Sequence, residues 1–252
     1  MRKTLFNTLF LISSAILQGC GSYDEEIHFY APRVEVYKEK FQLESNDYVG
    51  TALKQRLSII DTAEADLGYG GGGQVVAQCS LKTINGRITG RLVTVDTTFF
   101  KDTFDFDERG VMVAGAPYGE VLRHSTVFHE FGHCALDRLK HNCASKPNGY
   151  PASIMHTYVV NSSEFVTDYR RYIDELFINS EIFPKGATAP SGATSETVIP
   201  FDGCAGESGT ASLSASVSGE QTHTFFTKCV DMNKHKNSMD GRSVPNIQCW
   251  HE

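Results

Sequence analysis

The pentapeptide His129-Glu130-Phe131-Gly132-His133 constrains this chain more than any other segment, because it lies inside an apolar stretch with helical periodicity. Apolar side chains recur near every ~3.6 residues across 120–136, which predicts one helix there. Residues four apart lie on one face of a helix, so His129 and His133 point in the same direction. The fold must therefore place this helix where the two imidazoles can bind a single ion.

Two histidines at this spacing suit a zinc ion, which in catalytic sites typically has three protein ligands and a water. Glu130 adjoins the first histidine and can reach that water. We expect it to act as general base and then to pass the proton to the leaving amine. The motif predicts His129 and His133 as zinc ligands and Glu130 as a catalytic residue, while Gly132 lets another element approach the helix.

The segment Ser153-Ile154-Met155 follows the helix, and together with the histidine motif it resembles the metzincin branch of zinc peptidases. That family carries HExxHxxGxxH and, further on, a turn with a methionine beneath the zinc. The resemblance covers roughly residues 88–180 and implies a zincin-like α+β domain, with a mixed sheet and an active-site helix. It also implies that Met155 is the methionine of that turn.

The chain departs from the metzincin pattern after the second histidine. Leu136 stands at the glycine position, and Leu139 stands at the position of the third ligand. Bacterial lipoproteins with a HELGHC-type stretch and a longer loop are more similar here. We expect the helix to end soon after His133 and the chain to reverse, so that His141 becomes the third zinc ligand.

Other groups compete for this role. His156 or a carboxylate remains an alternative third ligand, and Glu164 or Glu175 would serve if the chain were a gluzincin. Asp137 would rise about 12 Å along the axis from the first histidine, so we expect it to fix a histidine tautomer instead. By resemblance to some metzincins, Tyr158 is a candidate for stabilising the oxyanion, with a packed aromatic ring as the alternative.

The N-terminus predicts export and a lipid anchor. Arg2 and Lys3 precede an uncharged apolar run over 5–17, which is too short to span a bilayer and has the shape of a signal-peptide core. The following Leu17-Gln18-Gly19-Cys20 resembles the lipobox of bacterial lipoproteins. This resemblance implies an acylated Cys20 and a protein anchored in the cell envelope, at the outer membrane or the cell surface. An ordinary cleaved signal is the alternative.

The other six cysteines are even in number, and in an oxidising compartment they suggest disulfides. Two pairings would involve the predicted site, namely Cys134 with Cys143 and Cys134 with Cys79, and the sequence does not choose between them. The net charge of −7 repels phosphate backbones, which argues against nucleic acid as a partner.

Composition divides the chain into three parts. Residues 1–20 are the predicted signal peptide, 21–184 the catalytic domain, and 185–252 a Ser/Thr/Gly-rich linker with a small β-rich, disulfide-bearing module. Within the domain we expect one or two helices over 37–65, strands over 74–81 and 88–100 joined by a turn at 85–86, and a last helix near 163–176.

Two functions fit these features. The first is a zinc peptidase that hydrolyses a peptide or protein substrate at the cell envelope or outside the cell. The second is a binding or adhesion lipoprotein that keeps the zincin scaffold without turnover. The intact Glu130 favours the first, because a scaffold without turnover has no use for the base.

Overall fold

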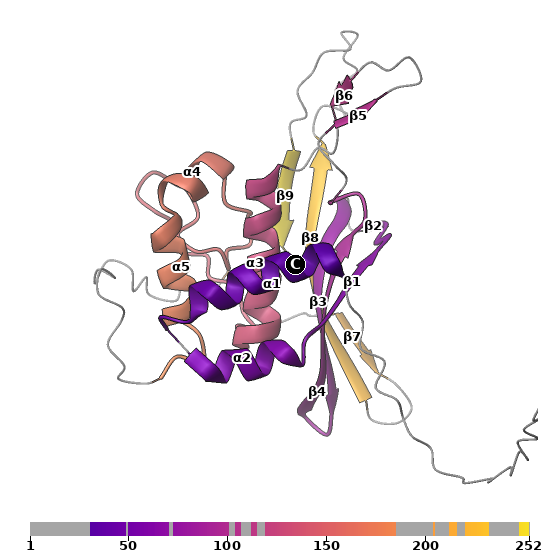
Figure 1. Cartoon of the computed structure of the whole chain (residues 1–252), viewed down its shortest axis with the longest axis vertical. Helices are drawn as coiled ribbons and strands as arrows, with labels where there is room; N and C mark the ends of the chain where they lie inside the picture. Colours follow the sequence, from indigo (N-terminus) through magenta and orange to yellow (C-terminus); the bar gives the residue numbers. More distant parts are fainter. Residues whose placement is uncertain are drawn as a thin grey trace, which may run out of the picture.

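A computed structural model describes residues 31–48, 50–70, 73–100, 104–106, 112–114, 119–184, 204, 212–215, 220–231 and 247–251. Over these residues the chain is an α+β protein, in which helices gather on one side of a mixed sheet (Figure 1). Among the described helices, none combines the length and the apolar character needed to cross a membrane.

The main sheet contains seven described strands: β1 (Asp61–Ala65), β2 (Tyr69–Gly70), β3 (Gly73–Ile84), β4 (Arg87–Asp96), β7 (Ser212–Ala215), β8 (Glu220–Asp231) and β9 (Ile247–His251). Their order is β1-β4-β3-β8-β7, with β2 paired to β3 and β9 paired to β8. The β1–β4 pair is parallel and the other pairs are antiparallel. Strands β5 (Phe104–Phe106) and β6 (Met112–Ala114) form a separate two-stranded sheet.

Five helices are described: α1 (Pro32–Ser45), α2 (Gly50–Ser58), α3 (Glu120–Leu136), α4 (Ser162–Thr167) and α5 (Tyr169–Ile178). Helix α3 lies between the sheet and the other helices (Figure 1). Phe41 of α1 packs against three aromatic rings at centroid distances of 5.0–5.3 Å, those of Phe128, Phe131 and Phe177. This aromatic cluster fixes α3 against α1 and α5, and so positions the helix that carries the histidine motif.

The expected helix over 120–136 is confirmed as α3, and the expected hairpin is confirmed as β3–β4. Asn85 and Gly86 turn this hairpin with φ of 52° and 74°, the left-handed values that a two-residue hairpin turn of this kind requires. The last predicted helix is instead two helices, α4 and α5, which break at Asp168. The helical interpretation of 37–65 is wrong for its last five residues, because Asp61–Ala65 forms β1 and pairs with β4.

The C-terminal strands differ most from expectation. Instead of lying in a separate module, β8 pairs with β3 from Gln74↔Cys229 to Ile84↔Glu220, and β7 and β9 flank β8. An unpaired edge of β3 would expose a row of backbone donors and acceptors, and β8 satisfies them. The described strands beyond residue 184, namely β7, β8 and β9, therefore complete the same sheet on which α3 packs.

Candidate metal centre

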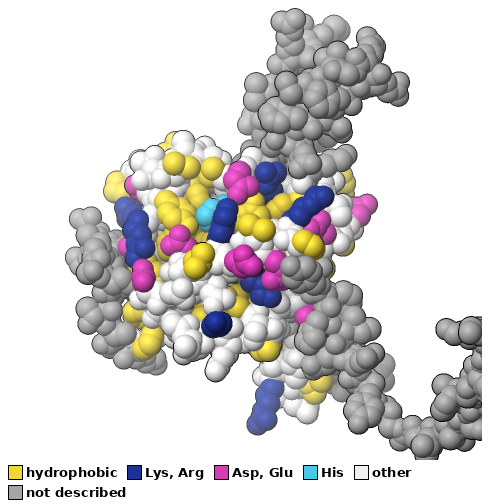
Figure 2. Space-filling view, viewed as in Figure 1, with side chains coloured by type: hydrophobic (Ala, Val, Ile, Leu, Met, Phe, Trp, Pro, Cys, Tyr) yellow, Lys and Arg dark blue, Asp and Glu magenta, His cyan; other side chains and the backbone are white. Residues whose placement is uncertain are grey.

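Helix α3 brings two imidazoles together, as its spacing predicts. The Nε2 atoms of His129 and His133 are 2.9 Å apart, and the two side chains are almost completely buried. On the face drawn in Figure 2, histidine occupies only a small area. The two ring nitrogens therefore face each other where bulk water does not screen them.

Hydrogen bonds fix which nitrogen of each ring carries the proton. Nδ1 of His129 lies 2.7 Å from the carbonyl oxygen of Ile154, and Nδ1 of His133 lies 2.5 Å from that of Arg138. A carbonyl oxygen only accepts, so both Nδ1 atoms are protonated and donate. Each Nε2 is then left with a lone pair, which is the tautomer that a metal ligand needs.

Burial lowers the pKa of His129 and of His133 well below the ordinary value, and neighbouring imidazoles push in the same direction. Both rings are consequently neutral near pH 7, and two Nε2 lone pairs oppose each other at 2.9 Å. Such an arrangement is repulsive unless an electrophile lies between the two atoms. The pair can therefore receive a cation.

His141 completes the cluster, and the chain reversal that places it follows the expected route. Helix α3 ends at Leu136, and Asp137 adopts a left-handed conformation with φ of 55°. The centroid of the His141 ring then lies 5.1 Å from the ring centroids of His129 and His133. One ligand atom from each histidine falls within 4.8 Å of the others, so the three residues can hold one metal ion.

The competing carboxylates are engaged elsewhere. Asp137 forms ion pairs with Arg56 and, at 2.7 Å, with Arg91, so it neither binds the cluster nor fixes a tautomer there. Glu164 pairs with Lys146 at 2.7 Å.

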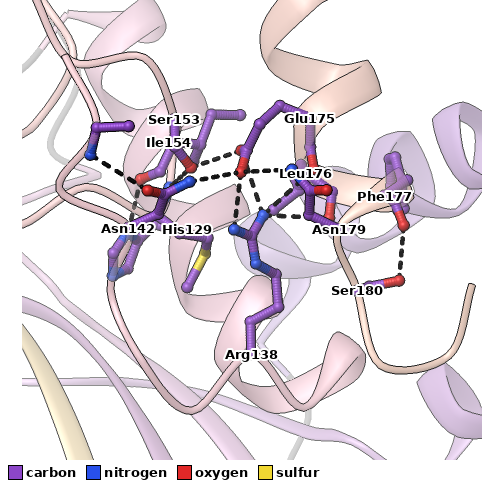
Figure 3. Close-up of polar contacts among 12 residues, drawn as sticks. His129, Arg138, Asn142, Ser153, Ile154, Glu175, Leu176, Phe177, Asn179 and Ser180 are labelled. Atoms are coloured by element: carbon purple, nitrogen blue, oxygen red, sulfur yellow. Dashed lines mark hydrogen bonds and ion pairs between the residues drawn. The ribbon is translucent and has the colours of Figure 1, made fainter. Parts of the chain in front are cut away.

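Glu175 belongs to a buried polar network behind the cluster (Figure 3). Arg138 donates to it at 2.8 Å, and the hydroxyl of Ser153 donates to its other carboxylate oxygen. The network holds in place the two backbone segments whose carbonyls receive the Nδ1 protons. Glu175 is thus engaged by Arg138 and Ser153 and is not part of the three-histidine group.

Met155 lies in the turn that follows, and it is fully buried. The hydroxyl oxygen of Ser153 accepts a hydrogen bond from the Met155 amide at 2.9 Å, which closes the turn. A Cβ added to Gly132 would lie 2.3 Å from the Met155 sulfur. The glycine of the motif therefore allows the methionine turn to approach α3 closely, as expected.

Glu130 is completely buried beside the cluster. Its Oε1 accepts a hydrogen bond from the Thr227 hydroxyl at 2.5 Å, whereas its Oε2 has no hydrogen-bond partner among the described residues. Burial raises the pKa of Glu130 to about 8, and the Thr227 hydrogen bond acts in the opposite direction. A carboxyl group with such a pKa exchanges protons readily near neutral pH.

Two residues of the C-terminal strands cover the cluster, and sequence reasoning missed both. The ring of His251 stacks on His129 at a centroid distance of 3.4 Å, and Phe225 stacks on His133 at 4.1 Å. Residues 225 and 227 on β8 share a face by alternation. No local signal in the sequence indicates that this face lies over α3.

Tyr158 is the predicted residue that lies outside the cluster. Its side chain is 58% exposed, and it lines a hollow of about 370 Å³ with Thr157, Gln248 and His251. The alternative ligand His156 is buried, and its Nδ1 accepts from the Tyr158 amide at 2.9 Å. Cys20 lies outside the described residues.

Three disulfides join the described residues: Cys79–Cys134, Cys143–Cys204 and Cys229–Cys249. The prediction that these cysteines form disulfides is confirmed, and of the two pairings considered near the site, the one that ties α3 to β3 occurs. Disulfides persist in oxidising compartments, which places the protein outside the reducing cytoplasm.

The fold and the site define an α+β protein of an oxidising compartment, with a buried three-histidine centre that can hold a metal ion. Comparison of the chain with protein-family models, curated proteins and solved structures gave no match.

Proposed function

We propose that this protein is a zinc-dependent peptidase of the cell envelope, with His129, His133 and His141 as the metal ligands. The observation that carries the proposal is the pair of opposed Nε2 lone pairs, because both Nδ1 protons are committed to backbone carbonyls. Three imidazoles suit zinc better than they suit magnesium or calcium, which prefer oxygen ligands.

When bound there, zinc would supply Lewis-acid polarisation of a substrate carbonyl. The chain itself supplies Glu130, whose Oε2 accepts the proton of an attacking water and afterwards delivers it to the leaving amine. Thr227 holds the other carboxylate oxygen, so the carboxyl group keeps one orientation during both transfers. The substrate is a peptide or protein, and acylated Cys20 anchors the enzyme to the membrane.

The test compares Glu130→Gln with the wild-type chain and with Glu39→Gln, which alters an exposed position of α1. We expect Glu130→Gln to bind about one zinc per chain and to lose at least ~100-fold in the hydrolysis of a quenched peptide, the loss typical of a missing general base. A zinc chelator should abolish the wild-type activity. Full activity of Glu130→Gln would refute the mechanism.

One observation favours a second function, that of a binding lipoprotein with a structural metal. The three histidines and Glu130 are at most 4% exposed, as expected for a closed structural site. This function predicts that metal raises the unfolding temperature and that no variant of the chain hydrolyses peptides. The two functions are thus distinguished by one measurement, the hydrolysis of a quenched peptide.

A further inference from the structure

Strand β9 is hydrogen-bonded along both of its edges. On one edge it pairs with β8, from Thr227↔His251 to Asp231↔Ile247. On the other edge, the His251 amide donates to the Thr157 carbonyl at 2.7 Å, and the Cys249 carbonyl accepts from the Val159 amide at 3.3 Å. Strand β9 therefore lies between β8 and the segment 157–159 that follows the methionine turn.

The same strand closes the metal centre. The ring of His251 lies parallel to that of His129, with an interplanar angle of 6°. Nδ1 of His251 is 2.7 Å from the Thr227 hydroxyl that donates to Glu130. Figure 1 shows β9 beside α3, at the side of the sheet that the helix covers. A peptide bond cannot reach the proposed ligands and base while β9 is in this place.

The gap that β9 fills has the chemistry of a peptide-binding groove. Without β9, β8 and the segment 157–159 would present two rows of backbone donors and acceptors toward one another. An extended peptide satisfies both rows, because its own donors and acceptors alternate between its two edges. A hollow is lined by residues of both elements, Gln248 and His251 of β9 and Thr157 and Tyr158 of the other segment.

We propose that β9 occupies the binding groove for an extended peptide strand, so that the described conformation is latent and its occupant is the chain's own strand. The Cys229–Cys249 disulfide fastens this occupant to β8. Displacement of β9 exposes the histidine cluster and leaves the groove free for a peptide in trans. The proposal rests on the proposed function for hydrolysis, but peptide binding can be measured independently.

The experiment uses a variant that lacks residues 247–252 and carries Cys229→Ser. The probe is an acetylated peptide with the sequence of 247–252 and serine in place of its cysteine, and the control is a scrambled peptide of the same composition. We expect calorimetry to show that the probe binds at least ~10-fold more tightly than the control, a difference of about 1.4 kcal/mol. Bound probe should slow hydrogen exchange in β8 and in 157–159.

In the same variant, hydrolysis of a quenched peptide should be at least ~10-fold faster than in the full chain, and the probe should inhibit it. A second pair of variants keeps the full chain, in case the truncated one does not fold. Cys229→Ser/Cys249→Ser and His251→Ala should speed hydrogen exchange of 247–251 and increase probe binding. The control His223→Ala, on the same β8, should behave as the wild type does.

The outcomes separate the two proposals. If the variants in which β9 is deleted or loosened bind the probe but none hydrolyses peptides, the result supports the groove and rules out the peptidase function. Equal hydrolysis by the full chain and by the released variants supports the peptidase and removes the groove. Failure of every released variant to prefer the probe over the scrambled peptide overturns the inference, as does loss of the β3–β8 pairing whenever β9 is released.

Discussion

At the scale of single residues, the positions of the protons on the histidine rings decide what the centre can do. His129 and His133 each donate Nδ1–H to a backbone carbonyl, so neither can relieve the contact between their Nε2 atoms by moving a proton. Protonation of one ring from solvent is opposed by burial, which lowers both pKa values. A metal ion therefore meets a site whose lone pairs are already aligned.

The third ligand gives the first prediction at this scale. We expect His141→Ala to lower zinc affinity by more than ~100-fold, beyond the 10–100-fold typical of losing a residue that only orients a ligand. The matched control is His156→Ala, which removes another buried histidine near the cluster. Competition against a chromogenic zinc indicator measures both affinities. Equal affinities in the two variants would remove His141 from the ligand set.

The residues of the centre were predictable where local geometry determines them. The shared face of His129 and His133 follows from helix dimensions, whereas the chain reversal that returns His141 was expected from the resemblance to zinc peptidases with a longer loop before the third histidine. His251 was not predictable, because it reaches the cluster through the pairing of β9 with β8, and no local pattern specifies which strands pair. The role expected of Asp137 failed for a similar reason, since Arg56 and Arg91 approach it from distant parts of the chain.

At the scale of elements, the methionine turn packs tightly against α3 at Gly132. The turn approaches α3 where Gly132 has no side chain, and Leu176 of α5 lies close to the same point. A residue without Cβ costs helix stability, about 1 kcal/mol relative to alanine. The tight contact with Met155 explains why this cost is tolerated in the middle of the helix.

Gly132→Ala should therefore destabilise the protein despite the better helix propensity of alanine. Overpacking a buried contact costs about 1–3 kcal/mol, which exceeds the gain of about 1 kcal/mol in propensity. Urea unfolding measures the net loss. Gly119→Ala is the control, because nothing lies within 4 Å of a Cβ added at that end of α3.

A double-mutant cycle with Met155→Ala sharpens this test. If the clash is with the methionine, Gly132→Ala should cost less in the Met155→Ala background, with a coupling energy of at least ~0.5 kcal/mol. Additive costs would show that the alanine methyl group meets something other than Met155.

At the scale of the whole molecule, a buried ion pair ties the histidine loop to α5. Burial alone would raise the pKa of Glu175, but the charge of Arg138 and hydrogen bonds from Arg138 and Ser153 outweigh it and leave the pKa below the ordinary value. A carboxyl group with a lowered pKa in the folded state stabilises the fold above its unfolded pKa of about 4.3, and this contribution is lost as pH falls through the folded pKa.

We therefore expect Glu175→Gln to cost about 3–5 kcal/mol at pH 7, because it leaves Arg138 buried without its countercharge. The difference from the wild type should shrink as pH falls from about 4.3, the pKa in the unfolded chain, through the lowered folded pKa, because the unfolded chain binds the proton before the folded one does. Urea unfolding at pH 7 and pH 3 measures both values, and Glu39→Gln serves as the exposed control. A constant difference at the two pH values would contradict the assigned role of the charge.

The overall architecture was predictable only in part. Periodicity located α3 and the β3–β4 hairpin, because both are determined by contacts within one stretch of chain. The position of β8 depends on its pairing with β3, between residues as far apart as Gln74 and Cys229. The composition after residue 184 suggested a separate module, because a segment rich in glycine and serine gives no local signal that a strand pairs with distant β3.

This long-range pairing also sets an order of events during synthesis and folding. Contacts of high sequence separation form slowly, and β8 and β9 are made after α3 and His141. We therefore expect the three histidines to be assembled before β9 covers them, so that a metal ion can enter at that stage. An ion bound beneath β9 would leave only as fast as the strand opens, and its retention would then be kinetic.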